Sequence, residues 1–98
     1  MKILPNLVAF DWDKGNKDKN VIKHGVSNKE AEEIFVDRNI LVMEDVEHSQ
    51  GEKRLYAIGK TKKNNILFIS FTIRHKSMIR IISARRAGRK EVKIYEKN

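Results

Sequence analysis

Four stretches in the second half of the chain are rich in apolar and β-branched residues, a composition and period typical of β-strands. The pattern predicts strands at residues 40–43, 54–59, 66–73 and 78–84. Polar segments separate these stretches, at residues 44–51, 62–65 and 74–77. Because short connections favour the pairing of consecutive strands, we expect a four-stranded antiparallel meander.

The first half of the chain opens with a short apolar stretch at residues 7–10, which predicts a first strand. Asp13 has a side chain that can cap a helix N-terminus, and we expect a polar helix from there to about Lys23. Gly25 follows Lys23 and His24, and a glycine after cations is a common helix end because it tolerates positive φ. The first helix is therefore expected to end before Gly25.

A second helix is predicted by the capping box Ser27-Asn28-Lys29-Glu30, in which the Ser hydroxyl and the Glu carboxylate bond each other's backbone N–H groups. Ala31, Ile34 and Phe35 recur at helical spacing, so we expect this helix to run to about Phe35 and to face the core there.

Residues 87–96, close to the C-terminus, predict a third helix with Val92 and Tyr95 on its inner side. Helices first, a sheet second and a helix last indicate an α+β fold with the helices packed on one sheet face. A length of 98 residues fits a single domain, residues 1–98.

The chain is strongly basic, with a formal net charge of +8 and a pI of about 9.9. Such an excess favours acidic partners: nucleic acid, an acidic protein or an anionic surface. The sequence has no cysteine, which excludes disulfides and thiolate metal sites. No apolar run approaches the ~20 residues of a membrane span, and no signal peptide is evident. We therefore expect a cytoplasmic protein with no membrane association.

The last predicted strand contains Arg80 and runs directly into a block of cations that includes Arg85 and Arg86. Arginine forks bind phosphate through two nitrogens and stay charged at any biological pH. The block therefore predicts a site for a polyanion, and leaves open whether RNA or DNA is held or cut there.

Several separated motifs are similar to those of the BrnT family of type II toxins, which pair with BrnA antitoxins. The opening motif consists of Trp12-Asp13, Asn20, Lys23-His24-Gly25-Val26-Ser27 and Glu30-Ala31. The later motifs are Glu52-Lys53-Arg54, Ala57-Ile58-Gly59, Phe71-Thr72-Ile73-Arg74, Arg80-Ile81-Ile82-Ser83-Ala84-Arg85-Arg86, and Lys90-Glu91 to Tyr95-Glu96. The chain has Asn16 and Asn28 where many members carry Lys and Phe.

The resemblance implies a RelE-like fold and an endoribonuclease that inhibits translation. It also implies an antitoxin with a ribbon-helix-helix DNA-binding part, a two-plus-two complex with it, and repression of promoter DNA through the antitoxin. No cofactor is expected.

Cleavage of RNA without a metal requires a proton acceptor, a proton donor and stabilisation of the phosphorane charge. His24, His48 and His75 are widely separated and show no ligand spacing, so no metal site is expected. His24 is the acid–base candidate, and the alternative is a histidine that only meets the exposed carbonyls of a helix end. His48 and His75 lie in predicted turns and are interpreted as exposed and non-catalytic.

Arg54, Arg74 and Arg80 are the candidates for binding the reacting phosphate. Strand alternation places Arg80 with Ile82 on one face and Ile81 with Ser83 on the other. The alternatives are solvated charges at strand ends for Arg54 and Arg74, and for Arg80 an ion pair with a carboxylate such as Glu44 or Asp45.

The remaining RNA-binding candidates are Lys17, Lys23, Arg85 and Arg86, each with a solvated surface charge as the alternative. Of Arg85 and Arg86, we expect one to face RNA and the other solvent or antitoxin. The aromatic side chains of Trp12, Tyr56 and Tyr95 are interpreted as core. A non-catalytic nucleic-acid-binding module and a protein-interaction subunit remain the competing functions.

Overall fold

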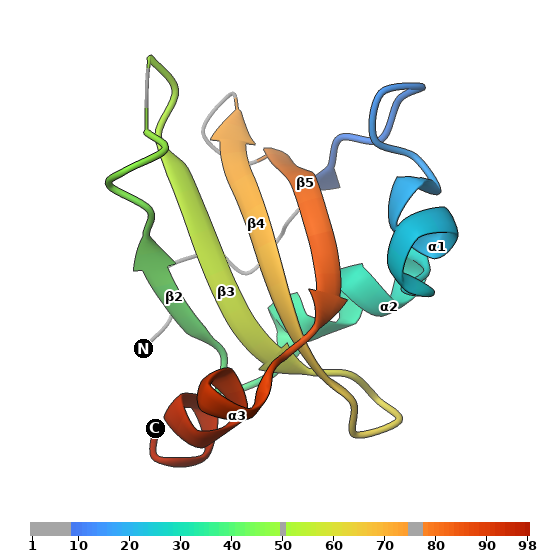
Figure 1. Ribbon diagram of the computed structural model, residues 1–98. Coiled ribbons are helices and arrows are strands. Elements are labelled where there is room, and N and C mark those ends of the chain that lie inside the picture. The colour runs from blue at the N-terminus through green and yellow to red at the C-terminus, as the bar shows by residue number, and fades with distance from the viewer. Residues whose placement is uncertain (1–8, 50, 75–77) are drawn as a thin grey trace.

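The computed structural model describes residues 9–49, 51–74 and 78–98, and these contain one five-stranded sheet (Figure 1). The strands are β1 (Ala9–Phe10), β2 (Leu41–Glu44), β3 (Arg54–Lys60), β4 (Ile66–Arg74) and β5 (Met78–Arg86). They lie in the order β1-β5-β4-β3-β2. Consecutive strands from β2 to β5 pair antiparallel, which confirms the predicted meander. His75 and the turn expected at residues 75–77 lie outside the described residues.

The predicted count of four sheet strands is wrong, because β1 joins the sheet as a fifth strand. It pairs parallel to β5, with Ala9 opposite Met78 and Phe10 opposite Ile79, and Asp11 N then donates to Ile79 O at 2.8 Å. This pairing joins segments almost seventy residues apart. A local pattern of apolar residues predicts that a strand exists but does not identify such a distant partner.

The helical segments are α1 (Lys19–His24), α2 (Asn28–Glu33), a 3₁₀ turn η1 (Ile34–Val36) and α3 (Arg89–Glu96). The predicted capping box is confirmed, since Glu30 N donates to Ser27 Oγ and Ser27 N to Glu30 Oε1, both at 3.1 Å. Gly25 has φ of 69°, which confirms the predicted helix end. No helix among the described residues has both the length and the apolar character needed to cross a bilayer.

The first helix is shorter than predicted: it begins at Lys19 rather than near Asp13, and turns occupy residues 14–18. The cause is the outer edge of β5, which this segment covers. Asn16 is buried, and its amide donates to Asp11 O at 2.9 Å and to Ile81 O at 3.1 Å. Lys19 Nζ donates to Ile82 O at 3.1 Å. Side chains thus satisfy edge carbonyls that would otherwise be exposed.

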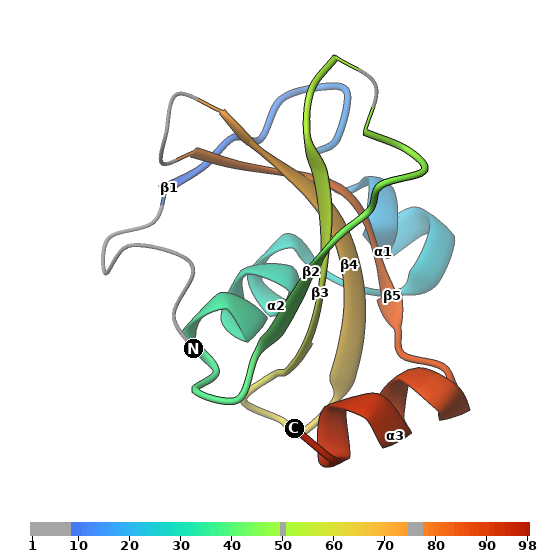
Figure 2. The ribbon, with the colours of Figure 1, turned by 90° about the vertical axis from the view of Figure 1, so that its left-hand side faces the viewer.

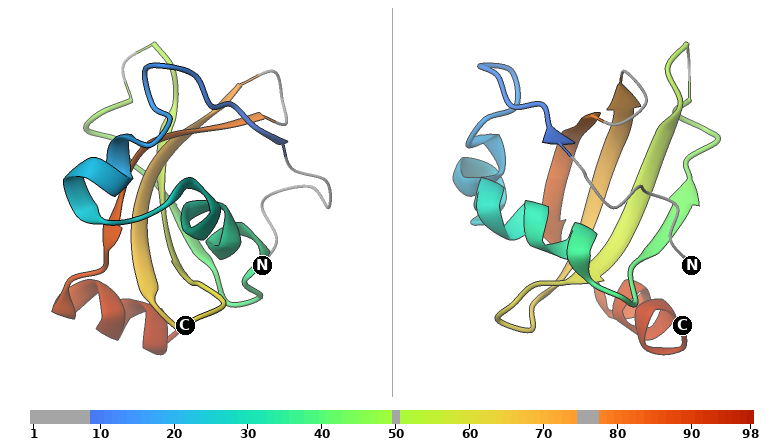
Figure 3. Two further views of the ribbon diagram at one scale, coloured as in Figure 1. Left: turned by 90° about the vertical axis from the view of Figure 1, so that its right-hand side faces the viewer. Right: turned by 180° about the vertical axis from the view of Figure 1, so that it is seen from behind.

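Helices lie on both sides of the sheet, so the expectation of helices on one face is wrong. Figures 2 and 3 show α2 on one side and α3 at the foot of the other. The side with α2 and η1 holds the main core, whose buried members are Val26, Ala31, Ile34, Ala57, Leu67, Ile69, Phe71, Ile79, Ile81 and Ala84. Tyr95 anchors α3, because its hydroxyl donates to Asp37 Oδ2 at 2.6 Å. We call the side with α3, beyond the area that α3 covers, the open face.

A β-bulge in β5 changes the alternation that the sequence predicts there. The register passes from Ser83 opposite Ser70 to Ile81 opposite Phe71, so Ile82 is an extra residue on β5. The prediction that Ile81 and Ser83 share a face is wrong, because Ile81 enters the core and Ser83 lies opposite Ser70 on the open face. The bulge leaves Ile82 on the same side as Arg80.

Candidate active site

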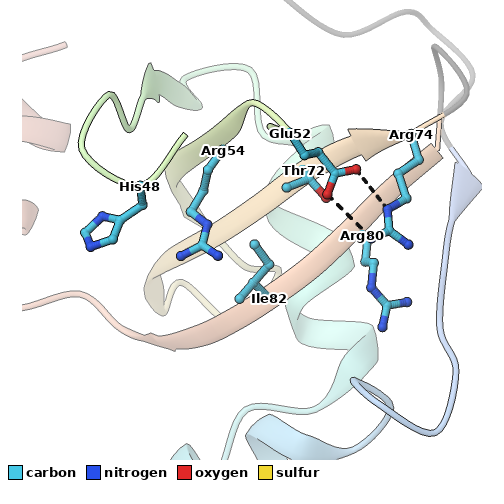
Figure 4. Close-up of a pocket in the computed structure, with 7 residues that line it drawn as sticks. All are labelled: His48, Glu52, Arg54, Thr72, Arg74, Arg80 and Ile82. Atoms are coloured by element: carbon cyan, nitrogen blue, oxygen red, sulfur yellow. Dashed lines mark hydrogen bonds and ion pairs between the residues drawn. The ribbon is translucent and has the colours of Figure 1, made fainter. Parts of the chain in front are cut away.

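A pocket lies on the open face (Figure 4). Its lining residues are His48, Glu52, Arg54, Thr72, Arg74, Arg80 and Ile82. Arg54 and Arg74 lie where β3 begins and β4 ends, which is the end of the sheet away from α3 (Figure 1). The pocket thus brings together the three arginines predicted to hold phosphate. It adds a histidine that the sequence pattern placed among the non-catalytic residues.

The strand register explains why the arginines meet. Arg54 on β3 lies opposite Thr72 on β4, and Thr72 lies opposite Arg80 on β5. Cross-strand partners share a face, and neighbouring strands are about 4.8 Å apart, so the three residues form a row about 10 Å long. Arg74 follows Thr72 by two positions and therefore lies on the same face, about 7 Å further along β4.

Arg80 is held by two carboxylates from the segment that covers the edge of β5. Its Nη1 and Nη2 donate to Asp13 Oδ2 and Oδ1 at 2.8 and 3.0 Å, and Nη1 lies 3.5 Å from Asp11 Oδ2. These hydrogen bonds lower the pKa of Asp13, with the Gly15 amide adding to the effect, and raise the pKa of Arg80. The pair is therefore charged at any biological pH. The alternative interpretation of Arg80, an ion pair with a carboxylate, is therefore confirmed, but the carboxylates are those of Asp11 and Asp13 rather than Glu44 or Asp45.

Arg74 forms a looser pair. Its Nε and Nη2 donate to Glu52 at 3.0 and 3.4 Å, and its Nη1 lies 3.7 Å from Asp11. About two fifths of each side chain in the Arg74–Glu52 pair is exposed. Figure 4 shows these two side chains meeting above the strands. Asp11 lies within ion-pair distance of both Arg74 and Arg80, so it fixes the spacing of their guanidinium groups.

Arg54 differs from the other two arginines because its guanidinium has no hydrogen bond or ion pair within the described part of the chain. Its backbone is well held: Arg54 N donates to Ser49 Oγ at 2.9 Å, and Asp45 N donates to Arg54 O at 2.9 Å. The side chain is half-buried and points into the pocket (Figure 4). A fixed backbone with an unpaired cation is an arrangement suited to an anionic ligand.

His48 is oriented by Asp45 in the loop between β2 and β3. His48 Nδ1 lies 2.9 and 3.0 Å from the Asp45 carboxylate oxygens, and Asp45 is buried. A carboxylate bound at Nδ1 fixes the ring orientation and favours the tautomer with a free Nε2. His48 is exposed, as predicted. The sequence signal that could have pointed to it is the spacing of Asp45 and His48, three residues apart, just before Arg54.

The histidine that the sequence predicted to be catalytic, His24, does not line the pocket. It is exposed at the end of α1, and Lys23 beside it and Lys17 in the preceding turn are exposed too. The lysine that contacts the sheet from this region is Lys19, through Ile82 O.

Arg85 and Arg86 lie in two different environments. Arg85 forks onto Glu91 at 2.8 Å through both terminal nitrogens and lies 4.4 Å from the Phe68 ring centroid, on the open face. Arg86 is exposed and donates to Asn65 Oδ1 at 3.2 Å. Of the two, Arg85 therefore shares a face with the pocket.

The three aromatic residues interpreted as core occupy different environments. Tyr95 is buried, and Trp12 is partly buried against the core with its Nε1 donating to Glu32 at 2.7 Å. Tyr56 is only half-buried and packs against Phe68 on the open face, with ring centroids 5.1 Å apart. Tyr56 is thus outside the main core.

The described residues contain no group of three or more His, Cys, Asp or Glu side chains placed to hold a metal ion. The charges at the pocket are instead guanidinium groups and the carboxylates that pair with them.

Comparison with known families gives one finding. Residues 12–91 match the family model described as the ribonuclease toxin, BrnT, of type II toxin-antitoxin systems. The matched segment contains every residue that lines the pocket. No curated protein matches the chain.

Proposed function

The chain belongs to the BrnT family of ribonuclease toxins of type II toxin-antitoxin systems, and on this premise we propose that the pocket is a metal-independent endoribonuclease site. The observation that carries the proposal is the convergence of His48 with Arg54, Arg74 and Arg80 around one pocket. An oriented imidazole and several guanidinium groups provide proton transfer and charge stabilisation without a bound metal.

His48 acts as the general base in this proposal. With Asp45 bound at Nδ1, the free Nε2 accepts the proton of a ribose 2′-OH, and the 2′ oxygen attacks the adjacent phosphorus. The bond from phosphorus to the 5′ oxygen then breaks, and that oxygen takes a proton from solvent at the exposed side of the pocket. The products are a 2′,3′-cyclic phosphate and a 5′-hydroxyl.

The arginines stabilise the charge that gathers on the phosphorane. Arg54 has no hydrogen-bond or ion-pair partner among the described residues, and the partner of Arg74 is exposed, so both side chains can turn to a phosphate at small cost. Arg80 is fixed by Asp13, and this fork holds it in place beside the row. Positioned donors that need no rearrangement during the reaction are the most effective form of electrostatic catalysis.

The wider surface supplies RNA-binding groups. Lys17, Lys23 and Arg86 are exposed and Arg85 lies on the open face, and we propose that these four contact the RNA backbone beyond the pocket. Their contribution is long-range attraction that salt weakens.

The partner in this proposal is a BrnA-like antitoxin with a ribbon-helix-helix part. It neutralises the toxin in a two-plus-two complex and carries that complex to promoter DNA. The type II family supports an antitoxin partner, and co-purification with mass measurement tests the stoichiometry.

The experiment that tests the site compares His48→Gln with His24→Gln. RNA is incubated with each variant and with the unchanged protein in EDTA, and the fragment ends are analysed. We expect His48→Gln to lower cleavage at least ~100-fold, the usual minimum for a general base, and His24→Gln to leave it within a few-fold. The reverse result would restore His24 as the acid–base group. Binding without strand breaks by the unchanged protein would favour a non-catalytic nucleic-acid module, and activity that EDTA abolishes would contradict metal independence.

A further inference from the structure

Thr72, at the centre of the arginine row, carries an unsatisfied polar atom. Only 4% of the residue is exposed, and its Oγ1 has no hydrogen-bond partner. Among the described residues it is the sole buried side-chain N or O atom without a partner.

The other buried polar residues of the described chain all use their side chains. Asn16 bonds two backbone carbonyls, and Asp45 holds His48. Thr61 gives the closest comparison, because it is also 4% exposed and its Oγ1 accepts from Asn65 N at 3.1 Å. A buried hydroxyl without a partner destabilises a folded protein, so its presence calls for a physical reason.

The surroundings of Thr72 supply one. Its register partners are Arg54 on one side and Arg80 on the other, and all three line the same pocket. Figure 4 shows the Thr72 side chain between Arg54 on one side and Arg80 on the other. A ligand that binds both guanidinium groups is an oxyanion. An oxyanion has further acceptor oxygens, and one of them can face Thr72, which lies between the two arginines.

We propose that Thr72 is a phosphate-binding residue, whose Oγ1–H donates to a non-bridging oxygen of the phosphodiester held by Arg54 and Arg80. This inference rests on the proposed function and names a further substrate contact in it. The hydroxyl then gains its missing partner only when substrate is bound. The unsatisfied hydroxyl lowers the stability of the free protein, and this destabilisation disappears when substrate is bound.

The test is Thr72→Val, which keeps the shape of the side chain and removes the hydroxyl. Because the free protein loses an unsatisfied group, we expect its thermal midpoint to rise by roughly 4 °C or more. Because the complex loses a hydrogen bond to a charged acceptor, we expect cleavage of RNA to fall about 10-fold or more. Stability and function thus change in opposite directions, which a merely structural role for the hydroxyl would not produce.

Two controls sharpen the comparison. Thr72→Ser keeps the hydroxyl and should retain cleavage within a few-fold. Thr61→Val removes a satisfied hydroxyl of equal burial and should lower the thermal midpoint while leaving cleavage unchanged, since Thr61 does not line the pocket.

Binding is measured separately with two probes that are not cleaved, inorganic phosphate and an oligonucleotide carrying 2′-O-methyl groups throughout. We expect Thr72→Val to weaken the binding of both and to reduce the thermal stabilisation that phosphate gives. A Thr72→Val protein that is less stable than the unchanged one, or that binds both probes with unchanged affinity, overturns the inference. If the unchanged protein cleaves no RNA but Thr72→Val still weakens both probes, the phosphate contact stands and the ribonuclease proposal fails.

Discussion

Arg54 gives the sharpest test of the pocket, because its guanidinium makes no hydrogen bond or ion pair with the residues that the structure describes. Its side chain has no ion pair or hydrogen bond to the described residues, and its backbone bonds to Ser49 and Asp45 do not depend on the side chain. Arg54→Gln therefore isolates the function of the cation from its role in folding. The same change at Arg80 would break the fork to Asp13 and confound the two.

The expected magnitudes for Arg54→Gln follow from these contacts. With no pair lost, the free energy of unfolding should change by no more than about 0.5 kcal/mol. A hydrogen bond to a charged group contributes about 1.5–3 kcal/mol, and donors aimed at developing charge contribute about 10²–10³-fold in rate. We therefore expect cleavage to fall about 100-fold in a protein of nearly unchanged stability.

The assay measures initial cleavage rates in EDTA, thermal unfolding, and the salt dependence of binding to 2′-O-methyl RNA. The matched control is Lys53→Gln, which removes the same charge from the neighbouring residue. Lys53 is mostly exposed, pairs only loosely with Glu44 at 3.6 Å and does not line the pocket. For Arg54→Gln, the slope of log affinity against log salt should decrease by about 0.7, the value for one phosphate contact on a single strand.

Two results would refute this reasoning. Arg54→Gln that is folded and cleaves at a rate close to that of Lys53→Gln would show that Arg54 meets no reacting phosphate. A large loss of stability in Arg54→Gln would show that the guanidinium is committed to the fold after all.

Two further predictions concern the fold and its pH dependence. Gly59→Ala should destabilise the protein by about 1–3 kcal/mol in chemical denaturation, because the added Cβ would lie 2.7 Å from Ile34 Cβ. The control is Gly88→Ala, which should be tolerated because its Cβ would meet no atom closer than 3.6 Å. The fork from Arg85 lowers the pKa of Glu91 below its ordinary 4.5, so this pair stabilises the protein above pH 4.5 and loses that effect as the pH falls through the lower folded value. Glu91→Gln should therefore cost about 1 kcal/mol or less at pH 7, and its unfolding midpoint should converge with that of the unchanged protein as the pH falls below 4.5.

The strands, the capping box and the glycine at the end of α1 could be predicted because each depends on residues close together in the sequence. The capping box needs only Ser27 and Glu30, and positive φ at Gly25 needs only a missing side chain. The parallel pairing of β1 with β5 could not be predicted, since it depends on contacts between distant segments. The prediction of a long first helix was wrong for a similar reason. The side chains of Asn16 and Lys19 bond to backbone carbonyls of β5, a strand that lies far away in the sequence.

The candidate site was partly predictable for a similar reason. Cations within apolar strands are conspicuous, so the sequence pattern pointed to Arg54, Arg74 and Arg80, and the register brings these three side chains to one pocket. Their part in binding phosphate stays a prediction. A histidine in a polar loop is not conspicuous, and His48 gains its importance only because the loop folds back beside β3. The identity of the acid–base group, His48 or His24, stays a prediction for the variants above to test.

The charges of the pocket and of the surrounding surface contribute differently to binding: the surface attracts a polyanion, and the pocket selects a phosphodiester. Arg74 and Arg80 are paired with Asp11, Asp13 and Glu52, so these three carboxylates offset the formal charge of the three arginines of the pocket. The net charge of +8 must then reside mainly on the surrounding surface, where most lysines are exposed. That surface attracts any polyanion at long range, while the paired arginines are spaced by their carboxylates before a ligand arrives. Within the part of the chain that the structure describes, Arg54 and Thr72 are the two members of the row whose side chains have no partner, so discrimination for a phosphodiester in one fixed position should depend on these two residues more than on the total charge.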